Sequence, residues 1–226
     1  MTLPAQHNRP SRHATITSIS AVTPDIKVVR LRPSRPFMFK AGQYIDVRFD
    51  NLEARPYSLA RAPGDDTLEI HIKRGNGPTS RYVMDCLQPG EEITFTGPEG
   101  QSWYDNTTRD PIVALAGGLG IAPIKAIAEQ AMKENHPHPF TLYWGTYSDA
   151  ERYLDENFQM MARQYSHFHY HPVTGDHVGE RALQHIDNFA GSQIFIPGPP
   201  VMIHHILPPP LEKSATRATI RYARHP

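Results

Sequence analysis

An apolar run followed at once by a glycine-rich turn constrains the fold of this chain more than any other feature. Residues 112–116 read Ile-Val-Ala-Leu-Ala, and the turn Gly117-Gly118-Leu119-Gly120 comes directly after them. A strand that is apolar on both faces is typical of a buried parallel sheet. Pro123 suits the first turn of a helix, where a missing N–H has little effect, so we expect a helix over about 123–134. The pattern predicts a strand–turn–helix unit of an α/β fold.

The spacing within this turn also predicts a ligand. Gly118, Gly120 and Pro123 follow the order of a dinucleotide-binding fingerprint in which proline replaces the third glycine. Glycine lets the backbone approach a pyrophosphate closely, and the N-terminus of the following helix favours negative charge. The alternative is an ordinary tight turn. Because a strand precedes the glycines and a helix follows them, we favour the phosphate-binding role.

The rest of the second half alternates between strands and helices. Short apolar segments predict strands over 140–144, 168–171 and 193–196, and longer segments predict helices over 149–164 and 180–187. Such alternation produces a parallel sheet with helices on its faces.

The first half has a different pattern, in which short β-like runs are separated by turns rich in Gly, Pro and Asp. One helix is expected over 80–87, and six strands are expected over 14–19, 26–31, 44–49, 57–60, 68–73 and 92–96. Six strands at this spacing indicate a small antiparallel Greek-key barrel. The chain is therefore predicted to have two domains after a flexible tail over 1–11: a β-barrel over 12–105 and an α/β parallel-sheet domain over 106–226.

Composition narrows the classes of function. The chain has 226 residues, and its 23 Lys and Arg balance its 23 Asp and Glu, which argues against a nucleic-acid-binding protein. No apolar run approaches the roughly 20 residues that span a bilayer. The polar start of the chain lacks the apolar core of a secretory signal. We therefore expect a cytoplasmic protein without a membrane span.

Cysteine and histidine usage bears on metal chemistry. The chain has one cysteine, whereas an iron–sulfur cluster needs four thiolates, or two with two histidines. Cys86 lies in an apolar stretch and is expected to be a small buried side chain. His167, His169 and His171 alternate along one predicted strand. They suggest either a zinc site or a solvated strand end, and we favour the second and expect no metal.

Arg55-Pro56-Tyr57-Ser58-Leu59 carries the chemistry of the first half. In an extended chain alternate side chains share a face, so Arg55, Tyr57 and Leu59 point one way. Such a strand offers a ring for stacking, a guanidinium for phosphate and a short hydroxyl. Those groups suit a flavin dinucleotide, which has a planar ring and a pyrophosphate. The alternative is an ordinary barrel strand with a surface arginine.

Two further stretches suit phosphate or nucleotide binding. The loop from Lys73 to Ser80 joins a strand to a helix and contains two cations and two hydroxyls. Thr79 or Ser80 is expected to cap that helix, whose N-terminus favours an anion; a polar hairpin loop is the alternative. The stretch from Ile196 to Met202 follows the last predicted core strand, where open α/β sheets bind ligands. Its alternative is a rigid turn.

In this order the stretches resemble the ferredoxin–NADP reductase-like flavoprotein family, most of all bacterial flavin reductases and oxygenase reductase components that lack a ferredoxin domain. The resemblance spans about residues 14–203. Residues 55–58 are similar to the family's Arg-x-Tyr-Ser flavin motif, and residues 77–80 to its flavin-phosphate motif. Residues 117–123 are similar to its nicotinamide-dinucleotide loop, and residues 143–145 and 198–202 also match.

The resemblance implies a role for each matching residue. Arg55 would hold the flavin pyrophosphate, and Tyr57 and Ser58 would form the catalytic pair, with Tyr57 stacked on the flavin and Ser58 near its N5. The glycines at 118 and 120 would contact the pyrophosphate of NADH or NADPH. The cofactor-binding residues implied are Arg55, Tyr57, Ser58, Leu59, His71, Lys73, Gly77, Thr79, Ser80, Gly117, Gly118, Gly120, Ile121, Pro123, Gly198, Pro199 and Pro200.

The implied function is hydride transfer from NADH or NADPH to N5 of a flavin, with FAD expected rather than FMN. Electrons would pass to free flavin or to a separate ferredoxin or oxygenase. Pro197 stands where the family usually has cysteine, and the C-terminal tail with Tyr222 also departs from the pattern. These departures leave open a flavin-binding electron-transfer or regulatory subunit with impaired hydride transfer. A non-enzymatic interaction protein without flavin is a further alternative, which the set Arg55, Tyr57 and Ser58 disfavours.

The region beyond residue 148 bears on the choice of nicotinamide. Asp149, Glu151 and Arg152 follow the second predicted parallel strand, where the adenosine ribose is expected. An acidic residue there favours the unphosphorylated ribose of NADH, and an arginine favours the phosphate of NADPH. Both charges are present, so the choice stays open, with a preference for NADH.

Overall fold

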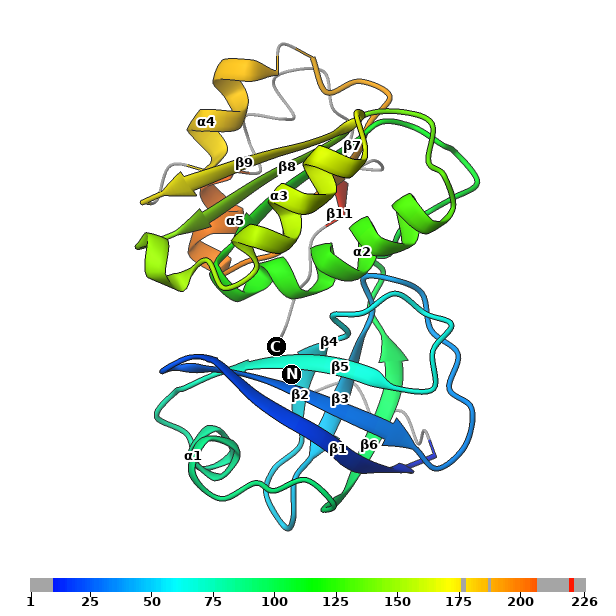
Figure 1. Cartoon of the computed structure of the whole chain (residues 1–226), viewed down its shortest axis with the longest axis vertical. Coiled ribbons are helices and arrows are strands. Elements are labelled where there is room, and N and C mark those ends of the chain that lie inside the picture. Colours follow the sequence, from blue (N-terminus) through cyan, green and yellow to red (C-terminus); the bar gives the residue numbers. More distant parts are fainter. Residues whose placement is uncertain (1–9, 176–177, 187, 207–219, 222–226) are drawn as a thin grey trace, which may run out of the picture.

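The computed structural model describes residues 10–175, 178–186, 188–206 and 220–221. These residues form two bodies stacked along the long axis of the molecule, a β-barrel and an α/β sandwich (Figure 1). The sequence-based expectations for the first nine residues and for Tyr222 concern parts of the chain outside this description.

The barrel consists of six antiparallel strands in the order β4-β3-β6-β1-β2-β5. Its elements are β1 (Arg12–Thr23), β2 (Ile26–Pro33), β3 (Tyr44–Arg48), β4 (Arg55–Ser58), β5 (Leu68–Lys73), α1 (Pro78–Asp85) and β6 (Glu92–Glu99). An isolated bridge between Leu59 and Ile70 joins the two end strands of this order. Apolar side chains at alternate positions, such as Ile16, Val29 and Ile45, fill the interior. The predicted six-stranded antiparallel domain is confirmed.

The second body has a parallel sheet in the order β11-β10-β7-β8-β9. Its strands are β7 (Ile112–Gly117), β8 (Phe140–Thr146), β9 (Phe168–Thr174), β10 (Gln193–Phe195) and β11 (Ile220–Arg221). Its helices are α2 (Ile121–Lys133), α3 (Asp155–Gln164), α4 (Val178–His185) and α5 (Pro200–Ile206), with short 3₁₀ turns η1 (Gly118–Gly120) and η2 (Asp149–Glu151). The predicted α/β parallel-sheet domain is confirmed.

Strand β7 shows why both faces of this sheet need cover. Ile112, Ala114 and Ala116 belong to the apolar cluster that includes residues of α2 and α3. Val113 and Leu115 belong to the cluster that includes residues of α4 and α5. Successive side chains of a strand point to opposite faces, so an all-apolar strand is buried between two helical layers.

Three local expectations were wrong. Helix α1 begins at Pro78, with Gly77 as its N-cap and no side-chain cap among the described residues, so Thr79 and Ser80 lie inside its first turn. Proline fits the first helical position because its φ is already helical and its missing N–H is unpaired there anyway. The helix ends at Asp85, and Cys86 is exposed rather than buried.

The predicted helix over 149–164 is divided into η2 and α3. Arg152 ends η2 with a ψ of 62°, outside the helical region. Strand β11 was not predicted at all. It is held by Arg221, which donates to the Trp103 carbonyl at 2.8 Å and pairs with Asp105 at 3.2 Å. These contacts join the sheet edge to the segment that connects the two bodies.

Candidate functional site

The glycine turn lies at the carboxyl end of β7 and leads directly into α2. Gly118 has a φ of 52°, and no described atom would lie within 4 Å of a Cβ at this position. The indole N–H of Trp144 on β8 donates to the Gly118 carbonyl at 2.9 Å, which fixes the turn. Ile121 begins α2, and Pro123 lies in its first turn. The turn therefore presents open backbone at a helix N-terminus, an arrangement that favours an anion.

A second loop packs against this turn. The Gly117 N–H donates to the Pro197 carbonyl at 3.1 Å. A Cβ at Gly120 would lie 2.2 Å from the same carbonyl oxygen and 3.0 Å from the Gly198 nitrogen. The structure therefore brings Gly117, Gly118, Gly120 and Gly198 together at the ends of neighbouring strands. Pro199 and Pro200 are exposed at the start of α5.

Strand β4 carries the predicted flavin residues. Arg55 is about half exposed and pairs with Glu53 at 2.7 Å. Tyr57 packs edge-on against Phe49 at 6.1 Å between ring centroids. Burial raises the pKa of Tyr57 to about 12 against the opposing charge of Arg55, so its hydroxyl is protonated at neutral pH. The Leu59 side chain is fully buried in the barrel core, which leaves only its backbone for a ligand.

The N-terminus of α1 is the second open anion site. Gly77 occupies the N-cap position with extended backbone and gives no side-chain cap, and no described atom would lie within 4 Å of a Cβ there. The Thr79 hydroxyl is buried and has no hydrogen-bond partner among the described residues. The Ser80 hydroxyl accepts from the Gly75 N–H at 2.6 Å and donates to the Lys73 carbonyl at 3.4 Å. An uncapped helix start with a buried hydroxyl lacking a partner fits a phosphate group of FAD.

Strand β5 shows polar side chains on its outer face. The His71 ring contacts the Tyr153 hydroxyl through Nδ1 at 2.8 Å and Glu69 through Nε2 at 3.1 Å. Because both ring nitrogens have protein partners, the His71 side chain is not free to bind a cofactor in this arrangement. Lys73 is exposed and pairs with Glu151 at 3.3 Å.

Sequence reasoning missed Glu69 and Tyr153, which are the partners of His71, and Lys125, which pairs with Glu69. Glu69, His71 and Lys73 alternate along one strand, and that polar alternation is the signal that would have found the β5 group. Lys125 and Tyr153 are distant in sequence, so no local pattern connects them to β5.

The region beyond β8 combines acidic and basic side chains. Asp149 is largely exposed, whereas Arg152 is 12% exposed and pairs with Asp149 at 2.6 Å. Arg152 also donates to Thr174 at 2.9 Å and lies 3.5 Å from Asp155. Hydrogen bonds from Thr174 and Arg152 lower the pKa of Asp149. The arginine is therefore engaged within the protein, and the carboxylate faces solvent.

The histidines of β9 do not gather as metal ligands. His171 stacks on Tyr143 with 4.6 Å between ring centroids, and His169 is exposed. Within the described ranges, no group of three or more His, Cys, Asp or Glu side chains is arranged to hold a metal ion. No helix in the described part of the chain is long and apolar enough to cross a membrane.

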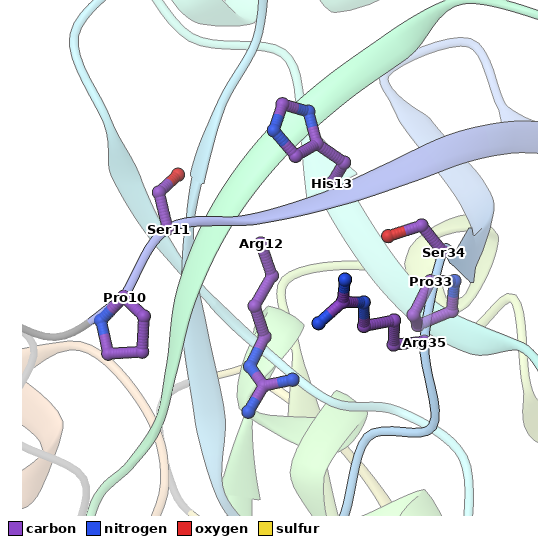
Figure 2. A pocket seen from close by; sticks show the side chains of 7 residues that line it. All are labelled: Pro10, Ser11, Arg12, His13, Pro33, Ser34 and Arg35. Atoms are coloured by element: carbon purple, nitrogen blue, oxygen red, sulfur yellow. The ribbon is translucent and has the colours of Figure 1, made fainter.

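A surface pocket lies elsewhere, between the start of β1 and the end of β2 (Figure 2). Figure 2 shows Arg12 and Arg35 beside each other, and Arg12 also lies over the Phe37 ring at 5.4 Å. The lining contains none of the predicted site residues; it consists of Pro10, Ser11, Arg12, His13, Pro33, Ser34 and Arg35.

Two family models match the chain in succession. Residues 13–104 match the oxidoreductase FAD-binding domain, and residues 114–207 match the oxidoreductase NAD-binding domain. These ranges follow the barrel and the α/β body.

Known reductases are similar to the chain. It is 32% identical over 200 residues to the ferredoxin–NAD(P)(+) reductase component of the naphthalene 1,2-dioxygenase system of Pseudomonas putida, covering 84% of this chain and 61% of that protein. It is 28% identical over 167 residues to an NAD(P)H-flavin reductase of Vibrio harveyi, covering 70% of each.

Solved structures agree in fold. A cytochrome P450 reductase from Amycolatopsis superposes with a TM-score of 0.85 at 24% identity, covering 95% of this chain and 70% of that one. The chain spans about three fifths of the length of the first dioxygenase reductase relatives. The two matched domains, their order and these relatives show that the chain belongs to the ferredoxin–NADP reductase-like flavoprotein family.

Proposed function

We propose that this chain is an NAD(P)H-dependent flavin or ferredoxin-type reductase that passes hydride from the nicotinamide to flavin N5. The observation that carries the proposal is the pair of open anion sites, one at the uncapped start of α1 and one at Gly118. Each belongs to a different body of the molecule. A protein that binds two phosphate-containing cofactors needs two such sites.

The proposed division follows the predicted domains, with residues 12–105 binding FAD and residues 106–226 binding the nicotinamide. Bound FAD would supply the ring that accepts hydride. Arg55 would bind its pyrophosphate, Tyr57 would cover the ring and Ser58 would lie beside it. The α1 N-terminus and the Thr79 hydroxyl would bind phosphate. The protein's contribution to the reaction is then chiefly the positioning of two rings.

The donor we favour is NADH. Its ribose carries a free 2′-hydroxyl. This hydroxyl can donate a hydrogen bond to the exposed Asp149 carboxylate. NADPH would place a phosphate beside that carboxylate, and Arg152 is already engaged with Asp149 and Thr174. The charges therefore favour the unphosphorylated ribose.

The proposed acceptor is free flavin or a separate ferredoxin or oxygenase. The names of the Pseudomonas putida and Vibrio harveyi relatives cover both kinds of acceptor. The one cysteine of this chain cannot hold an iron–sulfur cluster, so an acceptor that contains a cluster would be another protein or domain. The expected cytoplasmic location stays a prediction.

A second candidate is a flavin-binding subunit with impaired hydride transfer. It is favoured by Pro197, which is buried beside the glycine turn and offers no thiol. Its carbonyl instead binds the Gly117 N–H. The two candidates share the flavin site and differ in whether nicotinamide reduces the flavin.

The test is an anaerobic titration of the purified protein with FAD, by NADH and then by NADPH, followed by visible absorbance. Bleaching of the flavin band supports the reductase, and the more effective donor names the preferred nicotinamide. A bound flavin that stays oxidised supports the second candidate. Failure to bind or turn over flavin would contradict both.

A further inference from the structure

A buried ionic cluster joins the barrel to the helix that follows the glycine turn. Figure 1 shows α2 on the side of the sandwich that faces the barrel, with β5 opposite it. Glu69 lies on β5 with its side chain 4% exposed, and Lys125 lies on α2 with its side chain 15% exposed. Their charged atoms are 2.9 Å apart.

Lys125 has three oxygen partners, two of them in the barrel. Its Nζ donates to Glu69 Oε1 and to the Ala60 carbonyl, each at 2.9 Å. The third partner is Glu129, one turn along α2, at 2.7 Å. Glu129 in turn accepts from the Ala62 N–H at 3.0 Å. One ammonium therefore has all three of its N–H donors directed at oxygen atoms.

Glu69 is equally constrained. Besides Lys125, it contacts the His71 ring at 3.1 Å and Arg30 at 3.1 Å. Burial acts to raise the pKa of Glu69, but the His71 hydrogen bond and the Lys125 charge outweigh it and lower that pKa. Burial lowers the pKa of His71, so the ring is neutral at pH 7. A neutral ring that donates from Nε2 to the carboxylate accepts at Nδ1 from Tyr153.

The position of Lys125 in the chain connects the cluster to both predicted cofactor-binding segments. Gly120 ends the glycine turn five residues before Lys125, and the turn leads directly into the helix that carries Lys125. Ala60 follows Ser58 by two residues, and its N–H pairs with the Glu69 carbonyl on β5 at 2.8 Å. Lys125 thus binds the barrel directly beside the predicted flavin strand. A shift of α2 along the barrel would move the glycine turn relative to Ser58.

We propose that Lys125 is a positioning residue that sets the register between the nicotinamide-binding turn and the flavin-binding strand. The inference rests on the proposed function, because it concerns the approach of the two rings. Buried ion pairs are weak sources of net stability, and their best-attested use is to select one arrangement among several. Misplacement of reacting groups by about 1 Å can slow a reaction about 100-fold.

The experiment compares Lys125→Met with wild type and with Lys133→Met. Lys133 is an exposed lysine at the end of the same helix, so it controls for the loss of one charge from α2. FAD affinity, NADH affinity and the limiting rate of flavin reduction at saturating NADH are measured by anaerobic stopped-flow absorbance, with thermal unfolding beside them.

We expect Lys125→Met to lower the limiting rate at least tenfold while both affinities stay within about threefold of wild type, and we expect Lys133→Met to match wild type. An unchanged limiting rate would overturn the proposal. A limiting rate that falls only in proportion to the loss of NADH affinity would overturn it as well. If Lys125→Met does not fold, Glu69→Gln decides in the same way, since it keeps the side-chain size and removes the charge opposite Lys125.

The same data separate this inference from the proposed function. A wild-type protein that reduces flavin while Lys125→Met does so equally fast refutes only the positioning role. A wild-type protein that binds FAD and NADH but does not reduce the flavin refutes the reductase, and the positioning role with it.

Discussion

The two halves of the candidate site offer different kinds of groups to a ligand. The barrel offers side chains, and two of them, Arg55 and Lys73, are exposed with single carboxylates beside them. The α/β body offers backbone, in a turn where Gly120 lies against the Pro197 loop without room for a side chain. In the barrel half, each substitution should therefore remove one contact and weaken binding by a limited amount. In the glycine half, a single substitution should not be tolerated.

The largest expected effect is that of Gly120→Ala. The added methyl would lie 2.2 Å from the Pro197 carbonyl, a contact that forces one of the two loops to move. Since a displacement of about 1 Å can cost about 100-fold in rate, we expect at least that loss in NADH-dependent flavin reduction. Stopped-flow absorbance measures the rate of flavin reduction, and a thermal melt measures the stability of the variant.

Gly77→Ala is the matched substitution in the barrel half. No described atom would contact its added methyl, and its φ of −77° suits alanine. Its fold and its thermal midpoint should match wild type. Equal tolerance at both glycines would show that the contrast between the halves is wrong.

The same contrast explains what could be predicted from the sequence. The all-apolar β7 and the glycines after it form a local pattern, so strand, turn and helix were all placed correctly. The six barrel strands were predicted because their alternation and turn residues are also local. No local sequence pattern predicts β11, because its two residues pair with β10, which lies in a distant part of the chain.

The site was predictable to the extent that it consists of short motifs. Residues 55–58 and 117–123 could be proposed as binding residues because each is a continuous stretch, and their cofactor roles stay predictions. The cluster around Glu69 was missed, since it joins β5 to α2 and to Tyr153 across more than 50 residues. The predicted cap of α1 was wrong because the helix begins at a proline, which places the two hydroxyls that follow it inside the first turn.

Arg55→Ala sharpens the side-chain half of the comparison. Arg55 is half exposed and pairs with the exposed Glu53, so its loss should leave the thermal midpoint within about 2 °C of wild type. A hydrogen bond to a charged phosphate contributes about 1.5–3 kcal/mol, so FAD affinity should fall about 10- to 150-fold. Fluorescence titration with FAD measures the change.

Arg48→Ala is the control for that prediction. Arg48 is an exposed arginine on the neighbouring strand β3 and donates to the Leu52 carbonyl at 3.0 Å. It should leave FAD affinity unchanged. If both variants weaken FAD equally, the effect comes from the barrel's overall charge and not from a contact at Arg55.

Asp149→Asn tests the charge-based choice of nicotinamide in the other half. The change removes the carboxylate beside the proposed ribose site and weakens the hold on Arg152. We expect the ratio of kcat/KM for NADPH to that for NADH to rise about tenfold, or about 1.4 kcal/mol. Steady-state assays with both donors measure it. Glu156→Gln, an exposed acid on α3, should leave the ratio unchanged; an equal rise there would assign the effect to general charge.

The last expected effect concerns stability rather than catalysis, and it compares one buried histidine from each half, His71 and His136. Burial lowers the pKa of both, so the unfolded chain takes up protons near pH 6.5 while the folded chain does not. Stability is therefore full above about pH 6.5 and declines as pH falls, by up to about 1.4 kcal/mol per pH unit for each histidine. Urea unfolding at pH 7.5 and 5.5 measures the decline. His71→Gln and His136→Gln should each reduce it, whereas His138→Gln, at an exposed position, should not. A decline that persists undiminished in both buried variants would place the acid sensitivity in other groups.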